Sequence, residues 1–273
     1  MYTRILVPVD GSSFSNQILP LARTIARSTG AQLAVYRAVE KSDQLAEVSN
    51  ALRTLADAHG AQAICAEVRG DVAAAILGEA ARVPGTLVAI TSHGRSGVMR
   101  AVLGSTALNV LRTGGHPIVV YRPQEQPAGS AAAGGPIGRI FIPLDGSPLS
   151  ESIIPQAVEL ARGLKARVVV VSVLDPAASS AAGAAGAAPG DVMESNYVQA
   201  RAAAITQAHG IDAGWEVLHG DPEKAIPEFV RNYPNSMLAM TTRGRSALQS
   251  ALLGSVTAAA LREGGLAVYT RLP

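Results

Sequence analysis

The stretch "ILVPVDGS" at Ile5–Ser12 returns as "IFIPLDGS" at Ile140–Ser147. A second match follows in the same order, since "VRGDVAAAI" at Val68–Ile76 resembles "LHGDPEKAI" at Leu218–Ile226. Self-similarity at a fixed order along a chain indicates a repeated structural unit. The sequence therefore predicts two copies of one domain.

A segment rich in proline, glycine and alanine separates the two copies. It reads "RPQEQPAGSAAAGGPIG" at Arg122–Gly138, a composition typical of an interdomain linker. We therefore expect a first domain over residues 1–121, a linker over 122–138 and a second domain over 139–273. The second copy is longer, and its extra residues fall on the Ala/Gly/Ser stretch Asp175–Gly190, interpreted as a flexible surface loop.

Short apolar runs alternate with helix-like segments in each copy. The runs are apolar on both faces, as expected for buried parallel strands. The predicted strands are Ile5–Val9, Leu33–Val39, Ala63–Val68, Leu87–Ile90 and Ile118–Tyr121, and then Ile140–Leu144, Val168–Leu174, Gly214–Leu218, Leu238–Met240 and Leu266–Tyr269. Five strands alternating with helices predict an α/β fold in which each domain is an open, doubly wound parallel sheet.

The composition excludes several classes of protein. Hydrophobic residues make up 48% of the 273 residues, which favours a folded core, and the formal net charge is only +2. So small a charge gives no reason to expect nucleic acid or a membrane surface as a partner. With Cys65 as the single cysteine, no intrachain disulfide can form. No apolar run has the length of a membrane span or the form of a signal peptide, so we expect a cytoplasmic protein.

One acidic residue follows the first strand of each copy. These residues are Asp10 and Asp145, each placed at the carboxyl end of its strand, where open α/β sheets bind ligands. A carboxylate there would suit the hydroxyl groups of a ribose. The alternative is purely structural, because Asp-Gly-Ser is also a common turn and helix-capping sequence.

A second repeated motif follows the fourth strand. It reads "TSHGRSGVMRAVLGST" at Thr91–Thr106 and "TTRGRSALQSALLGSV" at Thr241–Val256. Gly104 and Ser105 open a helical stretch, whose free N–H groups and dipole would attract a phosphate. Arg95 would add positive charge near the outer phosphates. The alternative is that the Gly-Ser pair merely caps the helix.

Other ligand and catalytic motifs do not match. No P-loop sequence is present, and no G-x-G-x-x-G follows the first strand. The five histidines lack metal-ligand spacing. His93 is a candidate general base, but Arg243 replaces it in the second copy and cannot perform that role at neutral pH.

These motifs together resemble the universal stress proteins. The resemblance rests on the strand-end "PVDGS", the "GD" before the third helix, the "SHGRSG" turn and the "GS" after it, and covers nearly the whole chain twice. It implies the strand order 3-2-1-4-5 in each sheet, with a ligand between strands one and four. ATP-binding members carry G-x-x-G-x₉-G-[ST]. Gly94, Gly104 and Ser105 match it in the first copy, and Gly244, Gly254 and Ser255 match it in the second. Thr91 and Thr241 stand in place of the motif's first glycine.

The resemblance also implies a role for each site residue. Asp10 and Asp145 would hold the ribose, and the backbone near Ala38 and Val173 would meet the adenine. The phosphates would lie against Ser105 and Thr106 in the first copy and against Ser255 and Val256 in the second. Members of the family commonly pair through their fifth strands, so the two domains are expected to pair with each other in this way.

The sequence thus favours a stress-response regulator that binds ATP, with or without Mg²⁺, and hydrolyses it slowly or not at all. Two alternatives stay open. One is an interaction module that binds no nucleotide and acts by forming dimers, with a homodimer of the whole chain as one form, and it is favoured by Thr91 and Thr241. The other is an adenylate-handling enzyme that depends on His93. The first copy is expected to be the better binder, because Gly97 gives its turn more freedom than Ala247 gives the second.

Overall fold

A computed structural model describes residues 1–40, 44–92, 103–113, 115–123, 135–174, 189–242 and 253–271, with the backbone alone for 189–193. Most of the chain divides into two compact units, residues 1–136 and residues 137–269. We call them the first and second domains. The linker bounds stay a prediction, because residues 124–134 lie outside the described residues. Its last two residues join the second domain, where Ile137 is buried and the Gly138 amide donates to the Asn235 carbonyl at 2.9 Å.

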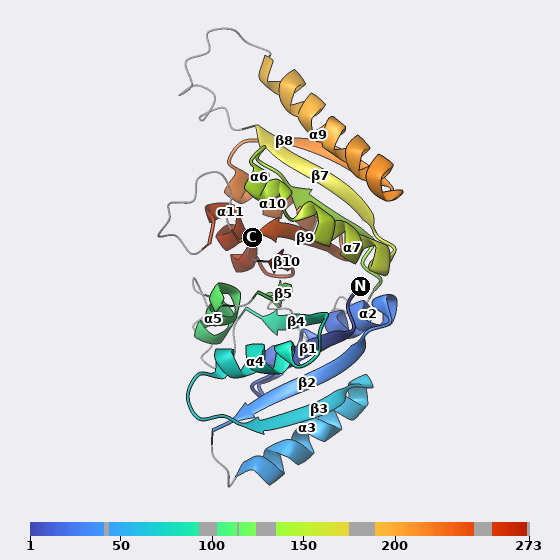
Figure 1. Cartoon of the computed structure of the whole chain (residues 1–273). Helices are drawn as coiled ribbons and strands as arrows, with labels where there is room; N and C mark the ends of the chain where they lie inside the picture. Colours follow the sequence, from blue (N-terminus) through green and yellow to red (C-terminus); the bar gives the residue numbers. More distant parts are fainter. Residues whose placement is uncertain are drawn as a thin grey trace. The chain divides into compact units, whose positions relative to one another are not determined.

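The first domain alternates strands and helices along the chain (Figure 1). Its elements are β1 (Arg4–Pro8), α1 (Ser13–Asn16), α2 (Leu19–Thr29), β2 (Gln32–Val39), α3 (Leu45–His59), β3 (Gln62–Glu67), α4 (Val72–Ala81), β4 (Thr86–Thr91), α5 (Ser105–Thr113) and β5 (Ile118–Tyr121). The strands are parallel and lie in the order β3-β2-β1-β4-β5. Every residue of β1 and β4 is buried, which explains why these strands read as continuous apolar runs.

The second domain repeats this topology. Its elements are β6 (Arg139–Pro143), α6 (Pro148–Glu151), α7 (Ile154–Leu164), β7 (Arg167–Leu174), α9 (Pro189–His209), β8 (Ala213–His219), α10 (Pro222–Arg231), β9 (Ser236–Thr241), α11 (Ser255–Arg262) and β10 (Ala267–Arg271). Its strands lie in the order β8-β7-β6-β9-β10. The predicted fold class and strand order 3-2-1-4-5 are therefore confirmed in each domain. The pairing of the domains through their fifth strands stays a prediction.

The predicted loop at Asp175–Gly190 ends two residues early. Residues 175–188 lie outside the described residues, whereas Pro189 and Gly190 already belong to α9. A proline suits the first turn of a helix, because the N–H that it lacks would have no helical partner there.

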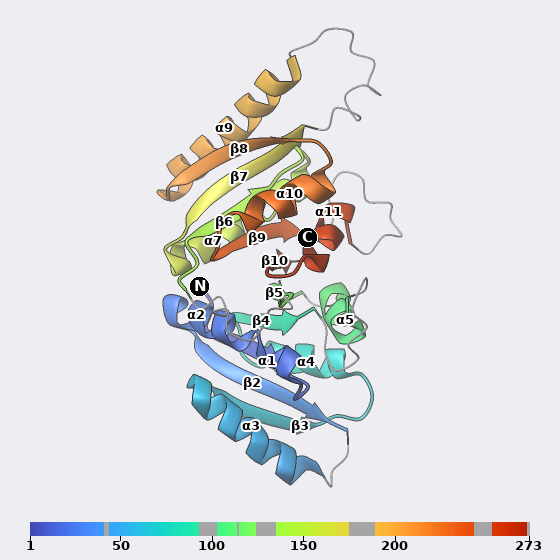
Figure 2. The same cartoon turned by 180° about the vertical axis from the view of Figure 1, so that it is seen from behind.

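Helices cover both faces of each sheet (Figure 2). In the first domain α2 packs beside α3, and α4 packs beside α5. The apolar face of α2 includes Leu21, Ile25 and Ala26, all of which are buried. Full burial of a side chain such as Ile25 contributes about 1.5–3 kcal/mol. This layered core holds the carboxyl ends of β1, β2 and β4 in one place, and the candidate site forms there.

The repeated Gly-Asp motif serves as a helix cap in both domains. The Asp71 carboxylate accepts hydrogen bonds from the amides of Ala73 and Ala74 at 2.8 and 3.3 Å, and Asp221 accepts one from Glu223 at 3.0 Å. These bonds satisfy amides that have no partner within the first turn of α4 and α10.

We therefore expect Asp71→Ala to destabilise the first domain by about 1 kcal/mol, because two amides of α4 lose their acceptor. Asp71→Asn keeps an acceptor oxygen and is the matched control. Amide hydrogen exchange of the α4 peptides would measure the loss. Equal protection in the alanine variant and the wild type would contradict this role of the cap.

Candidate functional site

A cleft of about 620 Å³ opens at the carboxyl ends of β1, β2 and β4 in the first domain. It collects residues that are far apart in the sequence. The predicted site residues that line it are Asp10, Ala38, Thr91, Gly104, Ser105 and Thr106. Gly94 and Arg95, also predicted, lie outside the described residues, as does His93. The structure therefore brings together the described members of the first predicted set.

The acidic turn after β1 uses its carboxylate locally. Asp10 Oδ1 accepts hydrogen bonds from the Ser12 amide at 2.9 Å and from the Ser12 hydroxyl at 2.6 Å. Ser12 in turn caps α1 by accepting from the Ser15 amide at 3.1 Å. This oxygen of Asp10 therefore stabilises the turn before α1, as the turn and capping sequence predicts, and the same residue lines the cleft.

Arg37 is a cleft residue that the sequence reasoning missed. It lies on β2 and reaches over the turn after β1, so that a Cβ built on Gly11 would come within 1.9 Å of its guanidinium Nη1. Gly11 has φ +79°, a conformation that other residues rarely adopt. The close approach and the backbone conformation both require glycine, and they place a positive charge beside the Asp10 turn.

The far side of the cleft is the start of α5. The Gly104 amide donates to the Ser92 carbonyl at 2.7 Å, and the Gly104 carbonyl accepts from the Leu108 amide at 2.9 Å. Gly104 therefore ties the helix to the end of β4, and its own N–H is already bonded. The next three residues, Ser105 to Ala107, line the cleft, and their amides belong to the first turn of the helix, where amides have no helical acceptor.

The remaining wall combines apolar and titratable side chains. Val48, Val72, Ile76 and Ile90 line it. Burial raises the pKa of the Tyr36 phenol, and the nearby Glu79 carboxylate raises it further, so this hydroxyl stays protonated at neutral pH.

The second domain repeats the turn and the helix start. Asp145 Oδ1 accepts from the Ser147 amide at 3.0 Å and from the Ser147 hydroxyl at 2.6 Å. The Gly254 amide donates to the Thr242 carbonyl at 2.7 Å, and no side chain caps α11. Thr241 ends β9 and is buried. Ser255 and Val256 open α11, Val173 lies near the end of β7, and Gly244 is outside the described residues.

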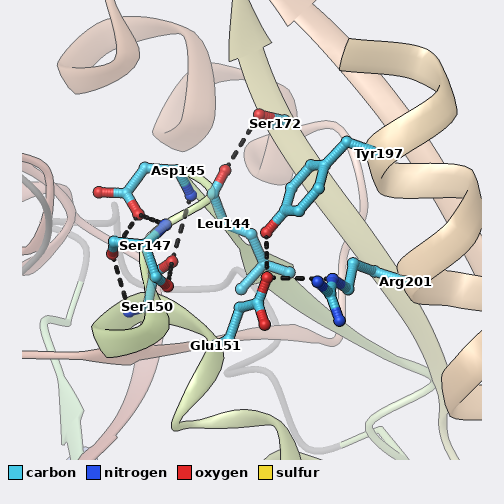
Figure 3. A network of polar contacts seen from close by, with 8 residues as sticks. All are labelled: Leu144, Asp145, Ser147, Ser150, Glu151, Ser172, Tyr197 and Arg201. Carbon is cyan, nitrogen blue, oxygen red and sulfur yellow. Dashed lines mark hydrogen bonds and ion pairs between the residues drawn. The ribbon is translucent and has the colours of Figure 1, made fainter. Parts of the chain in front are cut away.

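A polar network distinguishes the second domain at the end of β7 (Figure 3). Ser172, which occupies the position of Arg37 in the repeat, donates to the Leu144 carbonyl at 3.0 Å and also contacts the Glu194 carboxylate of α9. In the first domain, Gln44 occupies the position of Glu194 and lines the cleft. An acidic side chain thus reaches toward the strand end where the first domain presents a cation.

The same network continues along α9. The Tyr197 hydroxyl donates to Glu151 Oε1 at 2.8 Å, and Arg201 Nε lies 3.0 Å from the same oxygen. Burial raises the pKa of Tyr197, and the hydrogen bond to Glu151 raises it further. The phenol therefore remains a donor and links α9 to α6 (Figure 3).

Neither metal binding nor membrane crossing is indicated by the described residues. These residues contain no group of three or more His, Cys, Asp or Glu that could hold a metal ion. Among their helices, none combines the length and the apolar composition that crossing a membrane requires. His59 and His209 each end a helix, as their position before a glycine predicts.

Comparisons with known proteins agree with this architecture. The model of the Universal stress protein family matches residues 35–122 and 136–268. No curated protein sequence matches the chain. Among solved structures, a universal stress protein from Archaeoglobus fulgidus DSM 4304 is similar with a TM-score of 0.71 and 18% identity, over 98% of both chains. A functionally unknown protein from Pseudomonas aeruginosa PAO1 has a TM-score of 0.68 and 18% identity, over 100% of this chain and 93% of that chain. A universal stress protein in complex with cAMP matches 49% of this chain and 95% of its own, with 21% identity and a TM-score of 0.36.

Proposed function

Because the chain belongs to the universal stress protein family, we propose that it is a cytoplasmic stress-response regulator that binds ATP in the cleft of its first domain. The observation that carries this proposal is the convergence of an acidic turn, a strand end and a helix start in one cleft of about 620 Å³. Ligands of open α/β sheets bind at this end of the strands.

The triphosphate would lie at the start of α5. A helix N-terminus presents free amides and the positive end of the helix dipole, and both favour an anion. The amides from Ser105 to Ala107 are the available donors, and the hydroxyls of Ser105 and Thr106 add two more. Because Gly104 has no side chain, a phosphate can approach this turn closely.

The nucleoside would extend toward β2. Asp10 lines the cleft and would hold the ribose, and Ala38 belongs to the strand end that would meet the adenine. Apolar residues such as Ile76 and Val48 would cover the base, because aromatic bases bury well against aliphatic side chains. Arg37 would face the nucleotide as a cation from the strand side.

Hydrolysis is expected to be slow or absent. Fast phosphoryl transfer needs bound metal, a positioned base and a cation that stabilises the transition state. The described cleft residues include no histidine that could act as a general base. Mg²⁺ would arrive with the ATP and be held mainly by its phosphates. The protein would then respond to bound nucleotide rather than consume it.

The first domain is proposed as the stronger site. In the second domain, Glu194 approaches the end of β7 through Ser172, where the first domain has Arg37. Glu40 and Glu47 also line the first cleft, so the difference is the cation Arg37, which would attract an anionic ligand where Ser172 carries no charge. This difference supports stronger ATP binding in the first domain, which the replacement of Gly97 by Ala247 in the second copy also suggests.

The nucleotide-free interaction module is a second candidate, favoured by one observation. Thr91 is buried and lines the cleft at the position where the ATP-binding motif has glycine. If its side chain excludes the ribose, the same domain would act through protein contacts alone.

Isothermal titration of the full chain with MgATP separates the two candidates. We expect saturable binding with one strong site per chain and much weaker binding of adenosine, which lacks the phosphates. Mass analysis of ligand released from the purified protein gives an independent readout. No heat and no thermal shift at millimolar MgATP, with no nucleotide released, would leave the interaction module as the function.

A further inference from the structure

A second cavity lies at the opposite end of the strands in the first domain. It has a volume of about 530 Å³ and opens between the C-terminal ends of α2 and α3, beside the first residues of β2 and β3. Arg23, Arg27 and His59 are its titratable lining residues, and Gln32 and Gln62 lie where its two strands begin. The nucleotide cleft uses the other ends of the same strands, so the two cavities are separate.

The two arginines have no partner for their charges in the described part of the chain. Arg23 and Arg27 are one helical turn apart on α2 and therefore face the same side. Neither guanidinium makes a hydrogen bond or an ion pair with a described residue, and no described acidic side chain lines the cavity. Arg23 is partly buried and Arg27 is exposed. Like charges on one face of a helix repel each other, and a bound anion would relieve the repulsion.

His59 lines the same cavity and has an unsatisfied polar atom in its ring. Its Nδ1 is buried and has no hydrogen-bond partner among the described residues. Burial lowers the pKa of His59, and the charge of Arg23 lowers it further, so the ring is neutral at pH 7 and carries one N–H. A buried polar atom without a partner in a native protein calls for a ligand or water that satisfies it.

Backbone hydrogen bonds satisfy the ends of α2 and α3, so the arginines are not needed as caps, while Arg27 in the last turn of α2 also interacts favourably with the helix dipole. Both helices end in a glycine with left-handed backbone, Gly30 and Gly60, whose amides donate to the Ala26 and Ala56 carbonyls. The next amide, of Ala31, donates to Ala26 at 3.0 Å. The helix ends are therefore satisfied by backbone, as in a Schellman motif.

The second domain lacks this arrangement. Val158 replaces Arg23 and is buried, and Arg162, which replaces Arg27, donates to the His209 carbonyl. The repeat thus keeps one arginine and uses it to tie two helices together. In the first domain the corresponding arginine, Arg27, makes no such bond with a described residue and lines the cavity instead.

We propose that this cavity, the Arg23 pocket, binds a small anion that carries a phosphate group. The forked guanidinium of arginine matches the oxygens of a phosphate and can bind it through two parallel hydrogen bonds. Two such groups with the His59 imidazole suit the several oxygens of a phosphate better than the two oxygens of a carboxylate. The protein would then sense a phosphorylated metabolite at a site distinct from its nucleotide cleft.

The full chain is titrated with pyrophosphate, and the ring resonances of His59 are followed by NMR. These resonances are assigned as the signals that disappear in the His59→Gln variant. We expect a saturable shift, because the anion would contact this ring. The double variant Arg23→Gln, Arg27→Gln should bind at least about tenfold more weakly, since charge-assisted hydrogen bonds are lost. Arg53→Gln is the matched control, because Arg53 is an exposed arginine of α3 bonded to Asn50 at 3.3 Å.

Four results would overturn the proposal. The first is that the His59 resonances fail to move at millimolar pyrophosphate. The second is that the double variant keeps the melting temperature of the wild type and binds pyrophosphate as tightly. The third is that Arg53→Gln weakens pyrophosphate binding as much as the double variant does, which would mean that the anion is attracted by positive charge anywhere on the domain. Citrate titrated at matched ionic strength tests the ligand class, and binding equal to that of pyrophosphate would reject a phosphate site. The readout is local to His59, so failure of ATP binding in the cleft would not affect it.

Discussion

Glu79→Ala should destabilise the first domain by about 3–5 kcal/mol, because it strands a buried charge. Glu79 on α4 is paired with Arg4 on β1, whose Nη1 lies 2.9 Å from Glu79 Oε1. The two side chains are only 8% and 5% exposed. Arg4 also donates to the Glu79 carbonyl at 2.5 Å and to the Thr86 hydroxyl at 3.2 Å. Removal of the carboxylate leaves the guanidinium buried without a counter-charge.

The best measurement is native-state hydrogen exchange of β1, β4 and α4, because it reports each domain separately. Peptides of the second domain serve as an internal reference and should not change. Arg82→Ala is the matched control, since Arg82 pairs with the same Glu79 at 3.0 Å but is 77% exposed. An exposed pair contributes about 0–1 kcal/mol, so this variant should lose little. Equal losses in the two variants would show that burial of the Arg4 pair is not what stabilises the domain.

The second domain shows how the repeat dispenses with this ion pair. Phe229 stands at the position of Glu79, and Arg139 at that of Arg4. Arg139 lies over the Tyr233 ring at 5.0 Å from its centroid, and Phe141, Phe229 and Tyr233 pack as an aromatic cluster. One topology thus accommodates either a buried salt bridge or an aromatic core at the same point.

The strands and the position of the cleft could be predicted from the sequence. The ten strands follow from continuous apolar runs, because strands covered on both faces carry few polar residues. The gathering of Asp10, Ala38 and Gly104 follows from topology, since the carboxyl ends of neighbouring parallel strands meet at one edge. Both depend on periodicity and order along the chain, which a single sequence displays.

Side-chain contacts between distant elements could not be predicted in this way. Arg37 in the cleft, the Arg4–Glu79 pair and the contact of Glu194 with Ser172 depend on which face and which turn each residue occupies. A charged residue within a strand reads as an interruption of the apolar pattern, with no sign of its partner. The Arg23 pocket was missed for a similar reason, because it joins the ends of two helices that are unrelated in sequence.

Gly104→Val should weaken MgATP binding by at least ~100-fold, because each tenfold change in Kd is about 1.4 kcal/mol and several charge-assisted hydrogen bonds to phosphate would be lost together. Gly104 lines the cleft directly before the amides of Ser105 and Thr106. Its amide is held by the Ser92 carbonyl, so the backbone cannot shift to make room for a side chain. A valine there would occupy the space that a phosphate needs.

Gly254→Val makes the matching change in the second domain, where the Gly254 amide is held by the Thr242 carbonyl in the same way. It should leave the strong site unchanged, because we assign that site to the first domain. Each variant would be titrated with MgATP by calorimetry, and its melting temperature compared with the wild type to correct for the helix cap. A loss of binding in Gly254→Val with normal binding in Gly104→Val would reverse the order of the two domains. Normal binding in both single variants and loss only in the double variant would mean that the second domain binds ATP although Ser172 stands at the position of Arg37. Wild-type affinity in the double variant would remove the start of these helices from the site altogether.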